Sequence, residues 1–328
     1  MKVLIFGGAG FLGKHLQREF TNKGWTVSIA DVTSGDVIVD LLDAENVKQA
    51  VLDVSPDVIV HCASPPAEHK NEKLFYAVNV DGTKNVAEAA RAPSVKAFVY
   101  TSSASVVFNG ADLINANEDY PIANPPFDSY TDSKAKGEAA ALAADEWVPT
   151  CAIRPAGIFG EHDRQVIPGM LQVMERGQTR FQIGSNNNLF DYTYAGNVAY
   201  AHILAAEALM EQERSKLARG QAFFITNMSP IPFFAMPRAI WAHCGHTPSS
   251  IIKIPKDLGI IIGGISEIVS YFTGREPGLN RFRIKFSCAV RYYSCAKAQA
   301  ILGYTPKYTL EEGIKRSLAW LDETKKEK

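Results

Sequence analysis

The chain has 328 residues, with 34 lysines and arginines against 35 aspartates and glutamates, which gives a net charge of −1. This balance lacks the basic excess of a broad nucleic-acid-binding surface, and 46% hydrophobic with 21% charged residues exclude disorder over most of the length. The five scattered cysteines form no C-x-x-C pair, which argues against a zinc site or redox dithiol and favours reduced thiols in a cytoplasmic setting.

Short apolar runs alternate with helical patterns through the first half of the chain. Runs rich in β-branched residues, typical of strands buried on both faces, lie at 3–6, 26–30, 37–39, 58–62, 97–101 and 150–153. Helical spacing between these runs predicts helices over 11–23, 44–53, 74–91 and 129–146. This alternation predicts an α/β fold with a Rossmann-type, doubly wound parallel sheet.

The pattern becomes less regular after about residue 155, which predicts a smaller C-terminal lobe. We expect residues 1–160 to bind a dinucleotide, segments around 190–230 to return to that domain, and residues 161–328 to form mainly a substrate-binding lobe. The most apolar segment, 258–272, is interrupted by Glu267 and is too short to cross a bilayer. It is either a buried helix of the lobe or a helix that touches a membrane surface.

The first predicted strand runs into three glycines with the spacing G-x-x-G-x-x-G: Gly7, Gly10 and Gly13. Glycines allow a tight turn and the close approach of a pyrophosphate, and the helix that opens at Phe11 and Leu12 presents free N–H groups to it. Asp31, 18 residues after Gly13, ends the second strand. A carboxylate there accepts hydrogen bonds from the adenosine ribose and repels a 2′-phosphate, which favours NAD over NADP.

Further small or polar residues follow the next two strands and are predicted to contact the cofactor: Asp40, Leu41, Cys62, Ala63 and Ser64. The first two residues are placed to hold the adenine edge, although an ordinary helix N-cap explains Asp40 equally well. The other three end the fourth strand, at the sheet edge where cofactors lie. His61, which precedes them, is interpreted as a packing residue.

Tyr130 and Lys134 form a Y-x-x-x-K pair, which a helix projects from one face. A lysine beside the phenol lowers the tyrosine pKa, so that the tyrosine can take a proton from an alcohol while hydride leaves for a nicotinamide. A serine cluster follows the strand at 97–101 and places a hydroxyl at the same edge.

These motifs resemble the extended short-chain dehydrogenases over nearly the whole chain, and within them the 3β-hydroxysteroid dehydrogenase group. The runs that carry the resemblance are 61–66 (HCASPP), 74–86 (LFYAVNVDGTKNV), 101–107 (TSSASVV), 153–160 (IRPAGIFG), 222–232 (AFFITNMSPIP) and 292–295 (YYSC). As a group they are far more specific than the glycine motif.

The resemblance implies roles for particular residues. Ser103 aligns with the catalytic serine of the family, ahead of Ser102 and Ser105, and Tyr130 is the implied general acid and base. Lys134 is expected to bind the nicotinamide ribose. Asn79 is expected to organise the helix beside the cofactor, or is purely structural. The residues expected to border the nicotinamide are Pro155, Gly157 and Ile158.

The resemblance also implies NAD-dependent oxidation of a 3β-hydroxyl on a sterol or triterpenoid-like substrate, with loss of a C4 carboxylate as carbon dioxide. The alternatives are a non-decarboxylating 3β-hydroxysteroid or terpenoid dehydrogenase or ketoreductase, a nucleotide-sugar epimerase and a non-catalytic NAD-sensing protein. A substrate carboxylate needs a cation, for which His162, Arg164 and Lys70 are candidates. No His/Asp/Glu cluster has metal-ligand spacing, so no metal is expected.

Relatives of this kind are often dimers, so we expect a homodimer formed through the helices around 74–91 and 129–146. A lipophilic substrate leads us to expect a cytoplasmic protein with peripheral contact to the endoplasmic reticulum. The lysine-rich end, 325–328, resembles a retrieval signal, and a solvated helix end explains it as well.

Overall fold

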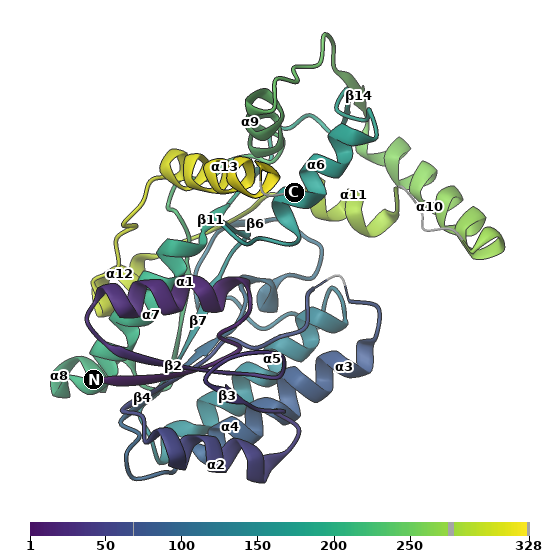
Figure 1. Cartoon of the computed structure of the whole chain (residues 1–328). Coiled ribbons are helices and arrows are strands. Elements are labelled where there is room, and N and C mark those ends of the chain that lie inside the picture. Colours follow the sequence, from purple (N-terminus) through teal and green to yellow (C-terminus); the bar gives the residue numbers. More distant parts are fainter. Residues whose placement is uncertain (68, 275–278, 327–328) are drawn as a thin grey trace.

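A seven-stranded parallel sheet forms the larger part of the computed structural model, which describes residues 1–67, 69–274 and 279–326 (Figure 1). From one edge to the other the strands are β12 (Gln221–Ile225), β7 (Thr150–Pro155), β5 (Ala97–Thr101), β4 (Val58–His61), β1 (Lys2–Phe6), β2 (Thr26–Asp31) and β3 (Val37–Ile38). Each neighbouring pair is parallel. The predicted doubly wound sheet is confirmed, and all six predicted strands lie in it within two residues at either end.

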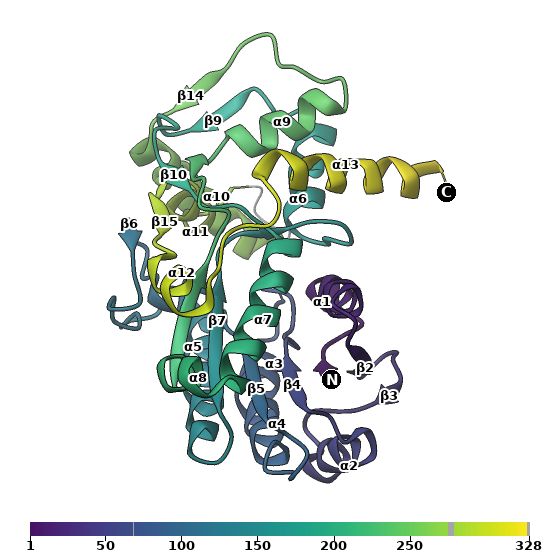
Figure 2. The same ribbon diagram turned by 90° about the vertical axis from the view of Figure 1, so that its left-hand side faces the viewer.

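Helices cover both faces of this sheet (Figure 2). One face carries α1 (Phe11–Asn22), α7 (Ala195–Met210) and α12 (Ala296–Leu302), and the other carries α2 (Ala44–Val54), α4 (Thr83–Ala89) and α5 (Ser129–Leu142). Side chains of β1 alternate between the two layers, since Val3 and Ile5 pack under α1 while Leu4 and Phe6 pack on the opposite side. This burial on both faces explains the unbroken apolar runs of the sequence.

Two of the predicted helices are less regular than their spacing indicates. The predicted helix over 74–91 is α3 (Glu72–Tyr76), a π-helical stretch (Ala77–Gly82) and α4. The predicted helix over 129–146 is α5 followed by a 3₁₀ turn (Ala143–Glu146). A π-helix carries one extra residue in its hydrogen-bonded turn, so periodicity at 3.6 residues does not reveal it.

A smaller lobe lies beyond the carboxyl edge of the sheet (Figure 1). Its core sheet has the order β13 (Ile231–Pro232), β10 (Leu189–Phe190), β15 (Arg291–Tyr293) and β6 (Leu113–Ala116). Two further strand pairs join β8 (Ile158–Phe159) to β11 (Thr193–Tyr194) and β9 (Phe181–Ile183) to β14 (Ile252–Ile254). The remaining helices are α6 (Val166–Glu175), α8 (Gln212–Ala218), α9 (Ala235–His243), α10 (Lys256–Thr273), α11 (Arg281–Cys288) and α13 (Leu310–Lys326).

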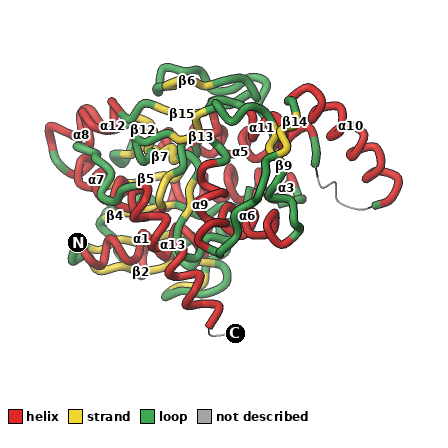
Figure 3. Tube along the Cα trace, turned by 90° about the horizontal axis from the view of Figure 1, so that it is seen from above, coloured by secondary structure: helices red, strands yellow, loops and turns green. Residues whose placement is uncertain are grey.

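The apolar segment 258–272 forms most of α10, which stands away from the body of the molecule (Figure 3). Only Gly259 and Gly263 of this helix are buried, whereas Tyr271 is 85% and Phe272 is 80% exposed. The interpretation of this segment as a buried lobe helix is therefore wrong. Within the described residues, no helix is long and apolar enough to cross a membrane.

Two predicted features fall partly beyond the residues that the structure describes. Within the less regular lobe predicted after residue 155, residues 275–278 lie outside the described part, and Gly274 ends α10 with a positive φ of 67°. The lysine-rich end is described as helical backbone through residue 326, and residues 327–328 lie outside the described part.

The packing of α1 makes a stability prediction. Leu16 is completely buried between this helix and the sheet, so Leu16→Ala is expected to lower the free energy of unfolding by about 2–5 kcal/mol. Leu52 on α2 is 46% exposed, and Leu52→Ala is expected to change it by about 0.5 kcal/mol or less. Urea denaturation followed by circular dichroism measures both, and equal losses for the two variants would contradict the placement of α1.

Candidate active site

The carboxyl ends of the parallel strands meet at one edge of the sheet, where the smaller lobe begins. The strand ends concerned are Phe6 in β1, Asp31 in β2, His61 in β4, Thr101 in β5 and Pro155 in β7. Ligands of open α/β sheets bind in the crevice outside these ends. Most residues predicted from the sequence for the site follow one of these ends, so the topology brings them to a common edge.

The three glycines form a turn with no room for side chains. Gly7 has a φ of 86°, and a Cβ atom there would lie 2.5 Å from the backbone nitrogen of Ala63. A Cβ at Gly13 would lie 2.4 Å from the carbonyl oxygen of Gly7, to which Gly10 donates its N–H at 3.1 Å. Helix α1 opens directly afterwards, at Phe11. The cradle therefore fits a pyrophosphate that approaches backbone N–H groups at a helix N-terminus.

Asp31 lies beside this turn. Its Oδ2 accepts a hydrogen bond from the backbone of Ala9 at 3.2 Å, while Oδ1 accepts from the backbone and hydroxyl of Thr33. The side chain is partly exposed. These contacts fix a carboxylate next to the glycine turn.

Asp40 and Leu41 follow β3. The N-cap of α2 is Asp43, whose side chain accepts from the backbone of Asn46, so the N-cap interpretation of Asp40 is wrong. Asp40 is exposed and accepts from the backbone of Leu42 at 3.0 Å, because the chain makes one more turn before the helix begins. Leu41 is buried.

The residues after β4 lie against the glycine turn. The Cys62 thiol donates to the carbonyl of Phe6 at 3.3 Å, Ala63 contacts Gly7, and the Ser64 hydroxyl donates to the carbonyl of Pro65. His61 is completely buried between aromatic rings, with its Nε2 at 3.0 Å from the Thr83 hydroxyl. Burial lowers the His61 pKa to about 3, as expected for a neutral packing residue.

Asn79 lies in the π-helical stretch and is completely buried. Its Nδ2 donates to the Ser133 hydroxyl at 3.0 Å, which ties the stretch to α5. Its Oδ1 has no hydrogen-bonding partner among the described residues. π-Helical turns are frequent at functional sites, and an unpaired amide oxygen at this depth is available to a ligand or an ordered water.

Ser103 and Tyr130 face each other across the sheet edge. Interaction with the Ser103 hydroxyl lowers the pKa of the Tyr130 phenol, but burial is the larger effect and raises it to about 12. The Ser103 hydroxyl also lies 2.9 Å from that of Ser105. Ser102 is buried, and its hydroxyl has no partner within the described chain. Of the three serines, Ser103 thus has the contact to Tyr130.

Lys134 is 2% exposed and lies one turn beyond Tyr130 on α5. Its ammonium donates to the carbonyl of Thr101 at 2.6 Å and lies 4.7 Å from the centre of the Tyr100 ring. Burial lowers the Lys134 pKa to about 8. The Tyr130 pKa is raised overall because loss of solvent around the phenol outweighs its interaction with Ser103, and the lowering expected from Lys134 stays a prediction.

The residues expected to border the nicotinamide lie where the sheet passes into the smaller lobe. Pro155 ends β7 opposite Ile225, and Ile158 pairs with Thr193 in the short β8–β11 pair. Gly157 has a φ of 40°, and a Cβ there would lie 2.7 Å from the ring of Phe190. A side chain at this position would therefore push the lobe away from the sheet edge.

An aromatic cage around Arg291 forms the adjoining wall, and the sequence reasoning missed it. The guanidinium carbon lies 3.7 Å from the ring centre of Phe286, 4.4 Å from that of Phe108 and 4.8 Å from that of Phe190. Arg291 directly precedes the run 292–295 that contributed to the family resemblance, but its partners come from three distant segments. Only the register of β15 beside β10 and β6 brings them together.

The three cations considered for a substrate carboxylate differ in their surroundings. Arg164 and Lys70 are exposed. The His162 ring makes an edge contact with Trp320 of α13 at 5.0 Å between ring centres, and burial, the largest cause, lowers the His162 pKa. Arg164 also acts electrostatically on His162, and the role of these cations stays a prediction.

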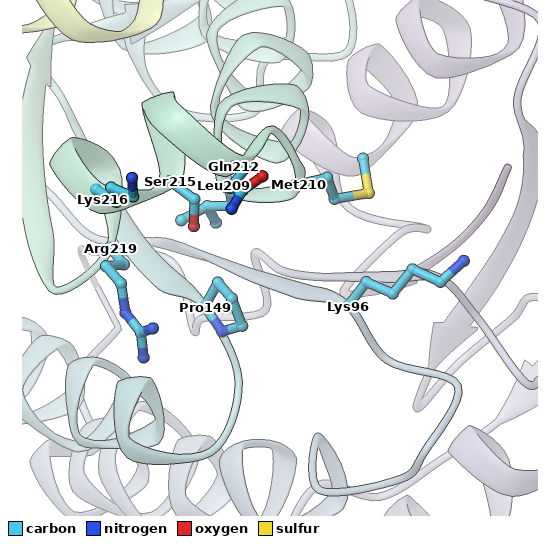
Figure 4. A pocket seen from close by; sticks show the side chains of 8 residues that line it. All are labelled: Lys96, Pro149, Leu209, Met210, Gln212, Ser215, Lys216 and Arg219. Atoms are coloured by element: carbon cyan, nitrogen blue, oxygen red, sulfur yellow. The ribbon is translucent and has the colours of Figure 1, made fainter.

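A pocket of about 480 Å³ lies at the opposite, amino edge of the sheet (Figure 4). Its lining residues are Lys96, Pro149, Leu209, Met210, Gln212, Ser215, Lys216 and Arg219. Three of its cations already form ion pairs with carboxylates of the surrounding chain. It shares no residue with the predicted site.

Comparison with known sequences gives extensive similarity. The model of the 3-beta hydroxysteroid dehydrogenase/isomerase family matches residues 4–256. The sterol-4-alpha-carboxylate 3-dehydrogenase, decarboxylating, of Saccharomyces cerevisiae is 43% identical, with 98% of each chain covered. The protein of the same name from Schizosaccharomyces pombe is 44% identical over 99% of each chain, and that from Homo sapiens is 35% identical over 96% of this chain and 86% of its own.

Solved structures resemble the fold at low sequence identity. The protein gox2253 gives a TM-score of 0.78 at 20% identity, covering 98% of each chain. The Bordetella bronchiseptica enzyme WbmG, solved in complex with NAD, gives 0.71 at 21% identity and covers 98% of this chain and 94% of its own. At these identities the likeness establishes the fold alone.

Proposed function

Because this chain belongs to the 3-beta hydroxysteroid dehydrogenase/isomerase family, we propose that it oxidises the 3β-hydroxyl of a 4-carboxylated sterol with NAD and releases carbon dioxide. The observation that carries the proposal is the contact of Ser103 with Tyr130 one helical turn before the buried Lys134. Relatives at 35–44% identity with nearly full coverage bear the name of this reaction.

The oxidation needs a base at the hydroxyl and a hydride acceptor at the carbinol carbon. NAD, when bound, supplies the acceptor. The Ser103 hydroxyl holds the substrate oxygen, and Tyr130 takes its proton. Because the Tyr130 pKa is raised to about 12, the phenolate needs positive charge nearby, which the Lys134 ammonium on the same helix face supplies below its own pKa of about 8.

Decarboxylation follows from the product of that step. A carboxylate on the carbon next to the new ketone loses carbon dioxide, since the electrons of the broken C–C bond flow into the carbonyl and form an enolate. Tyr130 and Ser103 donate hydrogen bonds to this oxyanion. The proton that Tyr130 accepted in the oxidation is the proton that the enolate needs, so the two steps together neither consume nor release one.

The domain division predicted from the sequence supplies the remainder of the proposal. We infer that residues 1–160 hold NAD, together with β12, which completes the sheet, and α7, which covers one of its faces, both from the 190–230 region. We also infer that the smaller lobe binds the sterol. Its aromatic residues between β10 and α11 suit a flat polycyclic substrate. They suit a nucleotide diphosphate less, which favours a sterol over the nucleotide sugar of an epimerase.

A two-substrate assay tests the function and the catalytic tyrosine. We expect the purified chain to reduce NAD with a 4α-carboxy-3β-hydroxysterol and to release a product that has lost the carboxyl mass. Tyr130→Phe is expected to lower kcat by roughly 100- to 10,000-fold, because the general base is removed, without weakening NAD binding. Absorbance of reduced nicotinamide and mass spectrometry of the product measure both.

The matched control is Tyr120→Phe, at a tyrosine that is 40% exposed, which should retain full turnover. Oxidation of the uncarboxylated analogue alone would indicate the simple 3β-hydroxysteroid or terpenoid dehydrogenase. Full activity of Tyr130→Phe would refute the catalytic assignment.

Asp31 gives a test of the cofactor. Asp31→Ala removes the carboxylate beside the glycine turn, so kcat/KM for NAD should fall roughly 10- to 100-fold, as for the loss of a charged hydrogen bond. The same change should improve the use of NADP, because repulsion of the 2′-phosphate is lost. Steady-state kinetics with both cofactors measure the ratio. Asp53→Ala, at an exposed aspartate of α2, is the control, and an unchanged ratio for Asp31→Ala would contradict the role.

We also propose that α10 provides peripheral contact to a membrane. The helix exposes Ile261, Ile265 and Ile268 by 57–60%, followed by Tyr271 and Phe272 at its end. An amphipathic helix with aromatic residues of this kind lies in the lipid interface, where a sterol would be found. The homodimer, the cytoplasmic location and the endoplasmic reticulum surface remain predictions from the sequence.

Sedimentation with phospholipid vesicles tests the contact. The double variant Tyr271→Ser with Phe272→Ser is expected to lose most of the vesicle-bound fraction, because the largest exposed aromatic area is removed. Ile114→Ser, at a residue of β6 that is 57% exposed, should bind as the unchanged chain does. Equal binding by all three would contradict a role for α10.

A further inference from the structure

Arg291 is a buried cation that forms no close ion pair within the described part of the chain. It is 5% exposed, and neither Nε nor Nη2 has a hydrogen-bonding partner among the described residues. Another buried arginine of the described chain has an anionic partner. Arg154 is 6% exposed, and its Nε donates to Glu138 at 2.8 Å. A buried charge left unpaired is costly, so an unused guanidinium needs an explanation.

The aromatic cage holds the charge but leaves its hydrogen bonds unmade. Three phenyl rings within 4.8 Å stabilise a cation through their faces. They offer no acceptor for the N–H groups, which a carboxylate takes in pairs. Burial lowers the Arg291 pKa to about 10, so the side chain is still charged at neutral pH.

The cage lies next to the reactive groups. Phe108 follows Ser103 by five residues, and its ring lies 4.7 Å from that of Phe127, three residues before Tyr130. Asp128, which caps α5, acts electrostatically on both Tyr130 and Arg291. On the other side, Phe190 contacts the backbone at Gly157, the expected nicotinamide wall.

We propose that Arg291 binds the carboxylate of the substrate and so selects a sterol acid over the corresponding neutral alcohol. This inference rests on the proposed function, since it names the group that recognises the C4 carboxylate in the same site. The carboxylate takes the free N–H groups, while the phenyl rings that flank the guanidinium face the apolar ring system. Arg291 is thus a specificity-determining residue.

Two substitutions at Arg291 test the proposal. Arg291→Met removes the charge but keeps an apolar side chain of similar length among the rings, and Arg291→Lys keeps the charge without the planar fork. The substrates are a 4α-carboxy-3β-hydroxysterol and its 4α-methyl analogue. We expect Arg291→Met to lower kcat/KM for the acid by about 100-fold or more, as for a desolvated charge pair that loses one partner. The value for the neutral analogue should stay within about threefold, and Arg291→Lys should lose roughly tenfold on the acid alone.

The control is Arg238→Met, at a partly buried arginine of the same lobe. Arg238 donates to Gln182 at 2.6 Å and lies 6.0 Å from the Phe234 ring centre, so its removal should affect both sterols equally. Thermal melting of each variant checks folding. If Arg291→Met does not fold, Arg291→Lys alone provides the comparison between the acid and the neutral sterol. Equal losses on acid and neutral sterol at Arg291 would overturn the proposal.

Equilibrium dialysis of the acid and its neutral analogue, with reduced NAD present, separates recognition from catalysis. The unchanged chain should bind the acid at least about tenfold more tightly than the neutral sterol, and Arg291→Met should abolish the preference. If the unchanged chain turns over neither sterol but shows this preference, the proposed reaction fails while the carboxylate site stands. If it oxidises both sterols without any preference in binding, the reaction stands and the role of Arg291 is refuted.

Discussion

The hydrogen bond from the buried Lys134 ammonium to the carbonyl of Thr101 is the contact on which the geometry of the site depends. It joins α5 to the end of β5 and gives a hydrogen-bonding partner to an ammonium that is 2% exposed and would be costly to leave unpaired. One turn further along, Gly137 allows the same close approach. A Cβ there would lie 2.2 Å from the carbonyl oxygen of Asn79 and 2.6 Å from the hydroxyl of Tyr100.

This contact sets the positions of groups that do not touch Lys134. Because α5 is held against β5, Tyr130 at its start comes to Ser103 just after the same strand. The π-helical stretch is held by the hydrogen bond from Asn79 to Ser133 of α5. Behind the strand, the Thr101 hydroxyl lies 2.7 Å from Nε2 of His202 on α7. Helices on both faces of the sheet thus support the same strand end.

The fold and the cofactor edge could be predicted from the sequence because both depend on local patterns. Parallel strands buried on two faces are continuous apolar runs, and the glycine spacing before α1 reports a turn that excludes side chains. The Tyr130 and Lys134 pair was visible for the same reason, since four residues make one helical turn. Two local features were not predicted: the N-cap at Asp43 instead of Asp40, and the π-helical turn. Each shifts the chain by a few residues without changing the spacing of its apolar residues.

The electrostatics and the second wall of the site could not be predicted, because they depend on burial and long-range register. The Tyr130 pKa is raised because the fold removes solvent around the phenol. The spacing of residues along the helix does not show how much solvent is removed. Arg291 resembles any other arginine in the sequence, and its cage exists only where β15 places it between Phe108, Phe190 and Phe286.

The sheet edge and the aromatic cage around Arg291 therefore impose different constraints on substitution. At the sheet edge, Gly7, Gly13 and Gly137 touch backbone atoms at distances that leave no room for a methyl group, so the groups that serve the common chemistry cannot move independently. The lobe wall is built from phenyl rings around one charge, and rings can be exchanged for other apolar side chains at smaller cost. Substrate selectivity among alcohols that undergo the same hydride transfer is therefore more easily changed in the lobe. There a single side chain, Arg291, decides whether a substrate carboxylate is bound.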